Sequence, residues 1–145
     1  MKGRIALMSI LLFAMYGSVG AQSATEDVRF SVVDVTIDSG GEKLAAYQVQ
    51  VEDAAGKATI VSLEGGEAKA FRSPPYYDPA AVSQSRVIIA AFSTDSDLPR
   101  GRTRVARLHV MVPAGAEPDF KATVHTAATT DGIVIEPVVS CEMGG

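Results

Sequence analysis

The stretch Lys43–Gly66, KLAAYQVQVEDAAGKATIVSLEGG, alternates apolar and polar residues on both sides of a short corner. Before the corner, one set is apolar and the other polar: Ala45, Tyr47, Val49 and Val51 against Gln48, Gln50 and Glu52. Successive side chains of a β-strand point to opposite faces of its sheet, so this alternation predicts a strand with one core face and one polar face. The corner carries Asp53 and Gly56, residue types that favour turns. The stretch therefore predicts two β-strands joined by a turn.

Similar segments recur along most of the chain. Strands are expected at Arg29–Ile37, Leu44–Asp53, Ala58–Gly65, Arg86–Ser93, Arg102–Val112, Asp119–Thr126 and Gly132–Val139, with a shorter one near Lys69–Arg72. Turn-forming segments that contain Gly, Pro or Asp separate them (GG, PP, LPRG, VPAG and DG). No sustained helical repeat interrupts the pattern. Many strands at near-regular spacing in a chain of this size predict a β-sandwich or a barrel.

The two-residue period also assigns a face to each strand residue. On the core side it places Val35, Ile37, Ala106, Leu108, Val110, Val112, Phe120, Ala122, Val124, Ile133 and Ile135, together with the apolar set of the first stretch. On polar faces it places Thr103, Arg107, His109, Met111, Lys121, Thr123 and His125. The segment RVIIAAF is apolar on both faces, which predicts a central strand or a strand flanked by a packed loop.

The first 21 residues have the features of a secretory signal peptide. Lys2 and Arg4 form a positively charged start, IALMSILLFAMY is an apolar run, and VGA ends at Ala21 with small residues. A membrane anchor is the competing interpretation, but the run of about 12 residues is shorter than the roughly 20 that a spanning helix needs. We expect a signal peptide at 1–21 and a single domain at 22–145, secreted or periplasmic and without a stable membrane span after cleavage.

Charge and cysteine content narrow the classes of partner. Of 13 Lys and Arg residues, Lys2 and Arg4 lie in the signal segment, so 11 remain against 17 Asp and Glu, a net charge of −6. An acidic domain without a basic cluster is a poor nucleic-acid binder, because such binding depends on neutralising phosphates. Cys141 is the only cysteine, so no internal disulfide can form, and the sequence leaves open whether it is free or pairs between chains.

The order and patterning of the middle strands resemble the bacterial cohesin domain and its relatives in the carbohydrate-binding-module superfamily. The resemblance covers about residues 30–112 and lies in VDVTIDSGGEKLAAYQVQVEDAAGKATIVSLEGGEAKAF, SRVIIAAFS and LPRGRTRVARLHVMV. In that family an acidic turn, usually Tyr-Asp-Pro, follows an early strand, and the next strand closes on a glycine. Here Glu52-Asp53-Ala54 occupies the turn and Gly65-Gly66 the closing glycine, while Gly101 precedes the long strand.

That resemblance implies an all-β jelly-roll sandwich of about nine antiparallel strands that binds rather than catalyses. Cohesins bind a dockerin module through one sheet face, and related modules bind polysaccharide. The resemblance therefore implies a protein partner, dockerin-like or another exported protein, with polysaccharide as the alternative and no cofactor. The chain has no Trp, the residue most suited to stacking on sugar rings.

Catalysis and metal binding find little support in the residue pattern. A Ser-His-Asp arrangement needs a histidine between a nucleophile and a carboxylate, and neither His109 nor His125 lies in a known nucleophile motif. Cys141 stands beside Glu142, whose charge disfavours a thiolate. Asp95 and Asp97 in STDSDLPRG offer oxygen ligands suited to calcium, but a solvated turn is the preferred interpretation. We predict no catalytic residue, and only this weak candidate for a metal site.

The segment SPPYYDPAA, 73–81, is the least ordinary part of the chain. Two prolines fix an extended backbone, so Tyr76 and Tyr77 are expected to point to opposite sides, one inward and one exposed. Exposed tyrosine on a rigid loop suits recognition, whereas a crossover loop whose rings cover a sandwich edge is the structural alternative. The predicted partner-binding residues are Tyr76 and Tyr77 together with Gln48, Gln50, Arg107 and His109, the latter four if both strands expose their polar faces on one sheet.

Overall fold

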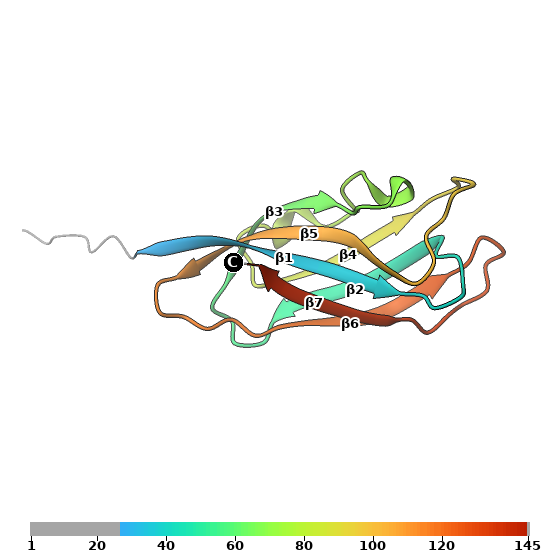
Figure 1. The fold of residues 1–145 in the computed structure, drawn as a ribbon. Helices are drawn as coiled ribbons and strands as arrows, with labels where there is room; N and C mark the ends of the chain where they lie inside the picture. Colours follow the sequence, from blue (N-terminus) through green and yellow to red (C-terminus); the bar gives the residue numbers. More distant parts are fainter. Residues whose placement is uncertain (1–26, 145) are drawn as a thin grey trace, which may run out of the picture.

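Seven antiparallel β-strands form two packed sheets in the computed structural model, which describes residues 27–144 (Figure 1). The strands are β1 (Val28–Asp38), β2 (Ala46–Asp53), β3 (Thr59–Gly65), β4 (Arg86–Phe92), β5 (Arg102–Pro113), β6 (Phe120–Ala128) and β7 (Val138–Gly144). Sheet A has the order β3-β5-β1-β7, and sheet B has the order β4-β2-β6. Two short 3-10 turns, Lys69–Phe71 and Pro79–Ala81, are the only helical segments in the described part of the chain. The predicted all-β sandwich is confirmed.

The chain changes sheet at every connection. Odd-numbered strands lie in sheet A and even-numbered strands in sheet B, so each turn carries the chain across the sandwich. Strands that are neighbours in a sheet are therefore distant in sequence, as in the β1–β5 pair, where Val28 lies opposite Pro113. Residues far apart along the chain consequently meet on one sheet face.

The core lies between the sheets and is built from alternate residues, as the two-residue period requires. The fully buried side chains include Val35 and Ile37 of β1, Val49 and Val51 of β2, and Leu108, Val110 and Val112 of β5. Tyr47 lies on the core side as well, with its ring edge-on to Phe71 at 5.4 Å between centroids. The predicted core faces of these three strands are confirmed.

One predicted face is wrong because of a bulge in β5. Val105 and Ala106 are consecutive in sequence, yet both are fully buried. The β1–β5 register shifts between Val35 and Thr36, which places an extra residue in β5 at this point. Residues before the bulge therefore change face, and Thr103 is buried rather than on the outer face.

The end of the chain also differs from the prediction. The last strand is β7, not Gly132–Val139, and Ile133 is 61% exposed instead of in the core. Of that segment, Val138 and Val139 belong to β7, and before them only Val134 forms a bridge, to Ala128, while Ile135 does pack against the core. The shorter strand expected near Lys69–Arg72 is a 3-10 turn. The described residues thus contain seven strands where about nine were predicted.

The RVIIAAF segment, β4, is at the end of sheet B and not at its centre. Its outer edge is partly covered by the segment SPPYYDPAA, 73–81, here called the tyrosine loop. The Tyr76 N–H donates to the Ala90 oxygen at 2.8 Å, and the Tyr76 oxygen accepts from the Ala90 N–H at 3.0 Å. Of the two predicted alternatives, the strand flanked by a packed loop is therefore the one found.

The corner after β2 is organised by the Asp53 carboxylate, which is almost fully buried. It accepts backbone N–H bonds from Ala55 at 3.0 Å, Lys57 at 2.6 Å, Ala58 at 2.7 Å and, from outside the corner, Asp119 at 2.7 Å. Burial alone raises the pKa of Asp53, but these four donors together hold it below its ordinary value. Asp53 is thus a turn former, as predicted.

Gly65 and Gly66, at the end of β3, lie where no side chain fits. A Cβ on Gly65 would be 2.0 Å from the Arg72 oxygen, and one on Gly66 would be 2.3 Å from the Arg104 oxygen. The strand therefore closes on two glycines because neighbouring backbone crosses directly above them.

The expected signal peptide, 1–21, lies outside the described residues. Within 27–144, no helix has the length and apolar character needed to cross a membrane.

Candidate binding face of sheet B

The outer face of sheet B is a set of cross-strand rows fixed by the β4–β2–β6 register. From one end to the other these rows read Phe92-Ala46-Ala128, Ala90-Gln48-Thr126, Ile88-Gln50-Thr123 and Arg86-Glu52-Lys121. The residues change along the sheet from small and aromatic, through rows in which Ala90 and Ile88 of β4 stand beside amides and hydroxyls, to charged. One end of the face is therefore apolar and the other is ionic.

The apolar end forms an open groove of about 240 Å³. Three of its lining residues, Ala46, Ala90 and Ala128, lie on the outer face of the sheet and are called its floor here; the lining also includes Tyr76 and Phe92. Tyr76 is 73% exposed and Phe92 is 69% exposed. Large aromatic surface left open beside a floor of small side chains is the kind of feature that marks a binding site.

The loop that carries Tyr76 is held by backbone and by packing. Tyr76 bridges to Ala90 on the edge of β4, while the neighbouring Tyr77 ring is half-buried and packs against the core. The Asp78 carboxylate then accepts the Ala80 N–H at 2.9 Å and begins the second 3-10 turn. The prediction that one tyrosine points inward and the other is exposed is confirmed.

Gln48 and Gln50 lie on this same face, half-buried, at the polar part of the sheet. The Gln48 amide nitrogen is 3.4 Å from Nδ1 of His125, and the Gln50 amide donates to the Glu52 carboxylate at 3.1 Å. Gln48 also lines the groove, so an amide with donor and acceptor atoms stands at the margin of its apolar floor.

The other two predicted contacts, Arg107 and His109, belong to a different face. They lie on β5 in sheet A, so the condition that they share one sheet with Gln48 and Gln50 is not met. The Arg107 guanidinium binds Asp34 through Nε to Oδ1 at 2.6 Å and Nη2 to Oδ2 at 2.9 Å. This hydrogen bonding by Arg107 is the main reason that the pKa of Asp34 is lowered. His109 Nε2 is 3.3 Å from the Glu64 carboxylate, so the Arg107 and His109 side chains each already contact a carboxylate of sheet A.

In the acidic loop after β4, the Asp95 carboxylate already has partners within the chain. The Asp95 carboxylate accepts the Asp97 N–H at 3.1 Å, and the Lys69 ammonium lies 3.7 Å from its second oxygen. In the described part of the chain, no group of three His, Cys, Asp or Glu side chains is arranged to hold a metal ion. Cys141 is half-buried on β7, and burial raises the pKa of its thiol to about 11.

Several residues of the apolar groove are absent from the predicted site. Phe92 and the three floor alanines come from β2, β4 and β6, and only the pairing of these strands brings them together. One signal for Phe92 was present in the segment RVIIAAF, which is apolar on both faces. Only one of these faces can pack in the core, so the other, which ends at Phe92, was a candidate for binding. Alanines at scattered positions carry no such signal.

Comparison with known proteins gives no match to a family model, a curated protein or a solved structure.

Proposed function

We propose that this chain is an exported, non-catalytic binding module with a cohesin-like jelly-roll sandwich, and that it binds a protein partner through the outer face of sheet B. The observation that carries the proposal is the alanine-floored groove with Tyr76 and Phe92 exposed in its lining. The finer fold is supported by the alternation of consecutive strands between the two sheets.

A protein partner suits the distribution of residue types on the face. Protein interfaces combine an apolar, aromatic-rich centre with a polar rim that fixes orientation. Here the apolar groove is followed by the Gln48 and Gln50 amides and then by Arg86, Glu52 and Lys121. Tyrosine is among the residues that most often supply a large share of binding energy, and Tyr76 is the most exposed aromatic side chain of this face.

Polysaccharide binding is the second candidate, and one observation favours it. Tyr76 and Phe92 both present rings to solvent at the same groove, and exposed rings can stack on sugars. Under this alternative the rings dominate and the charged end of the face is not needed. Under the protein proposal both ends of the face contribute.

The test is affinity capture from exported proteins beside a panel of soluble polysaccharides, followed by titration of the captured partner against variants. Ala90→Arg fills the groove without touching the core, and we expect it to weaken protein binding about tenfold or more. Ser62→Arg adds the same side chain to an exposed position of β3 in sheet A and is the matched control. Normal binding by a folded Ala90→Arg protein would reject the groove as the site.

Charge reversal at the ionic end separates the two candidates. Lys121→Glu should weaken binding of a protein partner and leave a neutral polysaccharide unaffected. Tyr76→Ala and Phe92→Ala should each reduce binding under either candidate. Binding of a polysaccharide that is lost in both ring variants and retained in Lys121→Glu would establish the glycan alternative in place of the protein one.

A further inference from the structure

β7 is an edge strand of sheet A with a pairing partner on one side only. It is hydrogen-bonded to β1 along its whole length, from Val138 opposite Asp38 to Gly144 opposite Val32. Figure 1 shows it at the margin of the sandwich, with β6 of the other sheet running nearby. No backbone hydrogen bond from residues 27–144 reaches β7 from its outer side.

The backbone groups that point outward can be identified from β1. Alternate residues of a central antiparallel strand bond to opposite neighbours. Asp27 accepts from Ala114 before β1, and Ser39 donates to Gly101 after it, so odd-numbered β1 residues bond toward β5. Even-numbered β1 residues therefore bond to β7, where the register places even-numbered residues opposite them.

The odd-numbered residues of β7 consequently direct their N–H and C=O groups away from β1. These residues are Val139, Cys141 and Met143. Unpaired backbone groups along a regular strand form a template for another strand. β7 also exposes apolar side chains of its own: Val138 is 72% exposed and Met143 is 37% exposed.

We propose that this edge pairs with β7 of a second copy of the same chain, antiparallel and centred on Cys141, so that sheet A continues through the dimer. Two-fold symmetry then places Cys141 opposite Cys141 of the second copy, and Val139 opposite Met143 of the second copy. Each outward N–H meets an outward C=O. The contact is isologous, the usual form of a symmetric dimer, and it leaves the outer face of sheet B free.

Charge and proline positions select this register over its neighbours. Moving the centre to Val139 puts Cys141 opposite Pro137, which has no N–H to donate, and Glu136 opposite Glu142. Moving it to Glu142 puts two carboxylates directly across from each other, which is unfavourable. Centring on Ser140 also requires Pro137 as a partner, opposite Met143. With Cys141 at the centre, Glu142 faces Ser140 and all three outward residues are paired.

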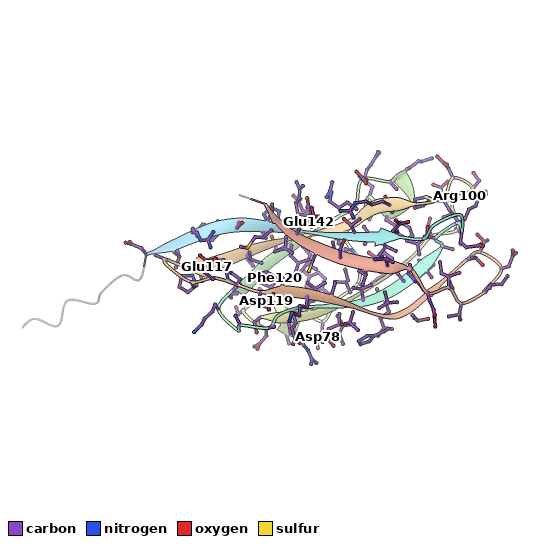
Figure 2. All side chains as sticks on the ribbon, turned by 60° about the horizontal axis from the view of Figure 1, so that its bottom comes forward. Asp78, Arg100, Glu117, Asp119, Phe120 and Glu142 are labelled. Atoms are coloured by element: carbon purple, nitrogen blue, oxygen red, sulfur yellow. The ribbon has the colours of Figure 1, made fainter. Side chains whose placement is uncertain are left out.

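Side-chain surroundings are compatible with the same register. Glu142 already has a cation beside it, because Arg102 Nη2 is 3.2 Å from its carboxylate. Figure 2 shows Glu142 on one side of the molecule and Asp78 on the other, so the edge is well separated from the tyrosine loop. Val139 opposite Met143 of the second copy removes partly exposed apolar surface from water.

Sedimentation equilibrium of the purified protein over a concentration series tests the dimer. We expect a concentration-dependent dimer that Met143→Pro converts to monomer, because proline removes an outward N–H that the β1–β7 ladder does not use. Met143→Ala keeps the N–H and should remain dimeric. A wild-type protein that is monomeric at all concentrations, or a folded Met143→Pro dimer, overturns the proposal.

Crosslinking tests the register and does not depend on the proline variant. Residues opposite each other in a hydrogen-bonded pair have Cα atoms about 5.5 Å apart, within disulfide reach. Diamide takes up the two thiol hydrogens and should join Cys141 to Cys141 of the second copy. Cys141→Ala combined with Ser140→Cys moves the thiol out of register and should crosslink at least about tenfold more slowly. Equal crosslinking of the two proteins overturns the register.

Discussion

The Asp53 carboxylate accepts a hydrogen bond from the Asp119 backbone N–H at 2.7 Å, across 66 positions of the chain. Asp53 ends β2 and Asp119 directly precedes β6, so this bond ties the acidic corner to the start of the neighbouring strand. The same carboxylate holds the Ala55, Lys57 and Ala58 amides. One side chain thus fixes both the turn and the approach of β6 to β2.

Asp53→Ala should lower the free energy of unfolding by about 2 to 3 kcal/mol, because the buried Ala58 N–H loses its acceptor and the β6 contact is lost. Urea denaturation followed by circular dichroism measures the change. Asp53→Asn retains one acceptor oxygen in a side chain of the same shape and should cost less. Equal losses in the two variants would contradict this expectation and show that one uncharged acceptor oxygen replaces no part of the carboxylate's contribution.

Acid should destabilise the protein through Asp53 and Asp34. Both have a pKa below the ordinary value in the folded state, Asp53 through its four backbone donors against the effect of burial, and Asp34 chiefly through Arg107. A carboxyl group whose pKa is lower in the folded state stabilises the fold fully above its unfolded pKa of about 3.9. This stabilisation is lost as pH falls through the folded pKa. Stability should therefore decline below about pH 4. In urea titrations across this range, Asp53→Asn should show a shallower decline than wild type.

Arg107→Glu should lower the melting temperature and leave binding at sheet B unchanged. The substitution removes the bidentate bond to Asp34 and puts a third carboxylate beside Asp34 and Glu64. Arg107→Lys keeps the positive charge but not the planar guanidinium that donates two bonds to Asp34, so it should lower the melting temperature less. Thermal melts at low and high salt check the cause, since added salt should narrow the difference between wild type and Arg107→Glu. Loss of partner binding in a folded Arg107→Glu protein would move the site to sheet A.

Val49→Ala should destabilise the fold by about 1 to 3 kcal/mol, whereas Gln50→Ala should change it little. Val49 is fully buried between the sheets, and Gln50 is half-buried on the outer face. Urea denaturation of both variants, with an unchanged slope against denaturant, measures the difference. A larger loss for Gln50→Ala would mean that β2 is shifted by one residue, which exchanges its two faces.

The sequence predicted those parts of the fold that depend on local alternation. Val49 and Val51 are separated by one polar residue, and that pattern alone assigns their face. The β5 bulge could not be predicted in this way, because the extra residue exists only relative to Val35 and Thr36 of its partner strand. The last strand was displaced for a similar reason: GIVIEPVV is rich in β-branched residues, which favour strands, yet its first half makes only a bridge to β6.

The candidate site was predicted in part for the same reason. Gln48, Gln50 and Tyr76 were identified by residue type and local pattern, and the structure places them on or beside one face. Arg107 was expected on that face only if its strand shared a sheet with Gln48, and it does not; nothing in a single strand states which sheet it joins. The alanine floor depends on the pairing of β2 with β4 and β6, which brings together residues from three separate segments.

Tyr77→Ala should lower the free energy of unfolding by about 1 to 2 kcal/mol, while Tyr76→Ala should change it by less than about 0.5 kcal/mol. The Tyr77 ring is half-buried and packs against the core, whereas Tyr76 is 73% exposed and is held through its backbone, which alanine keeps. Paired thermal melts and binding titrations of the two variants give opposite expectations: Tyr77→Ala melts lower and binds normally once folded, and Tyr76→Ala melts normally and binds more weakly. If Tyr76→Ala were the destabilised variant, the Tyr76 ring would stabilise the edge of the sandwich by packing. It would then no longer be a candidate for the main recognition residue of the groove.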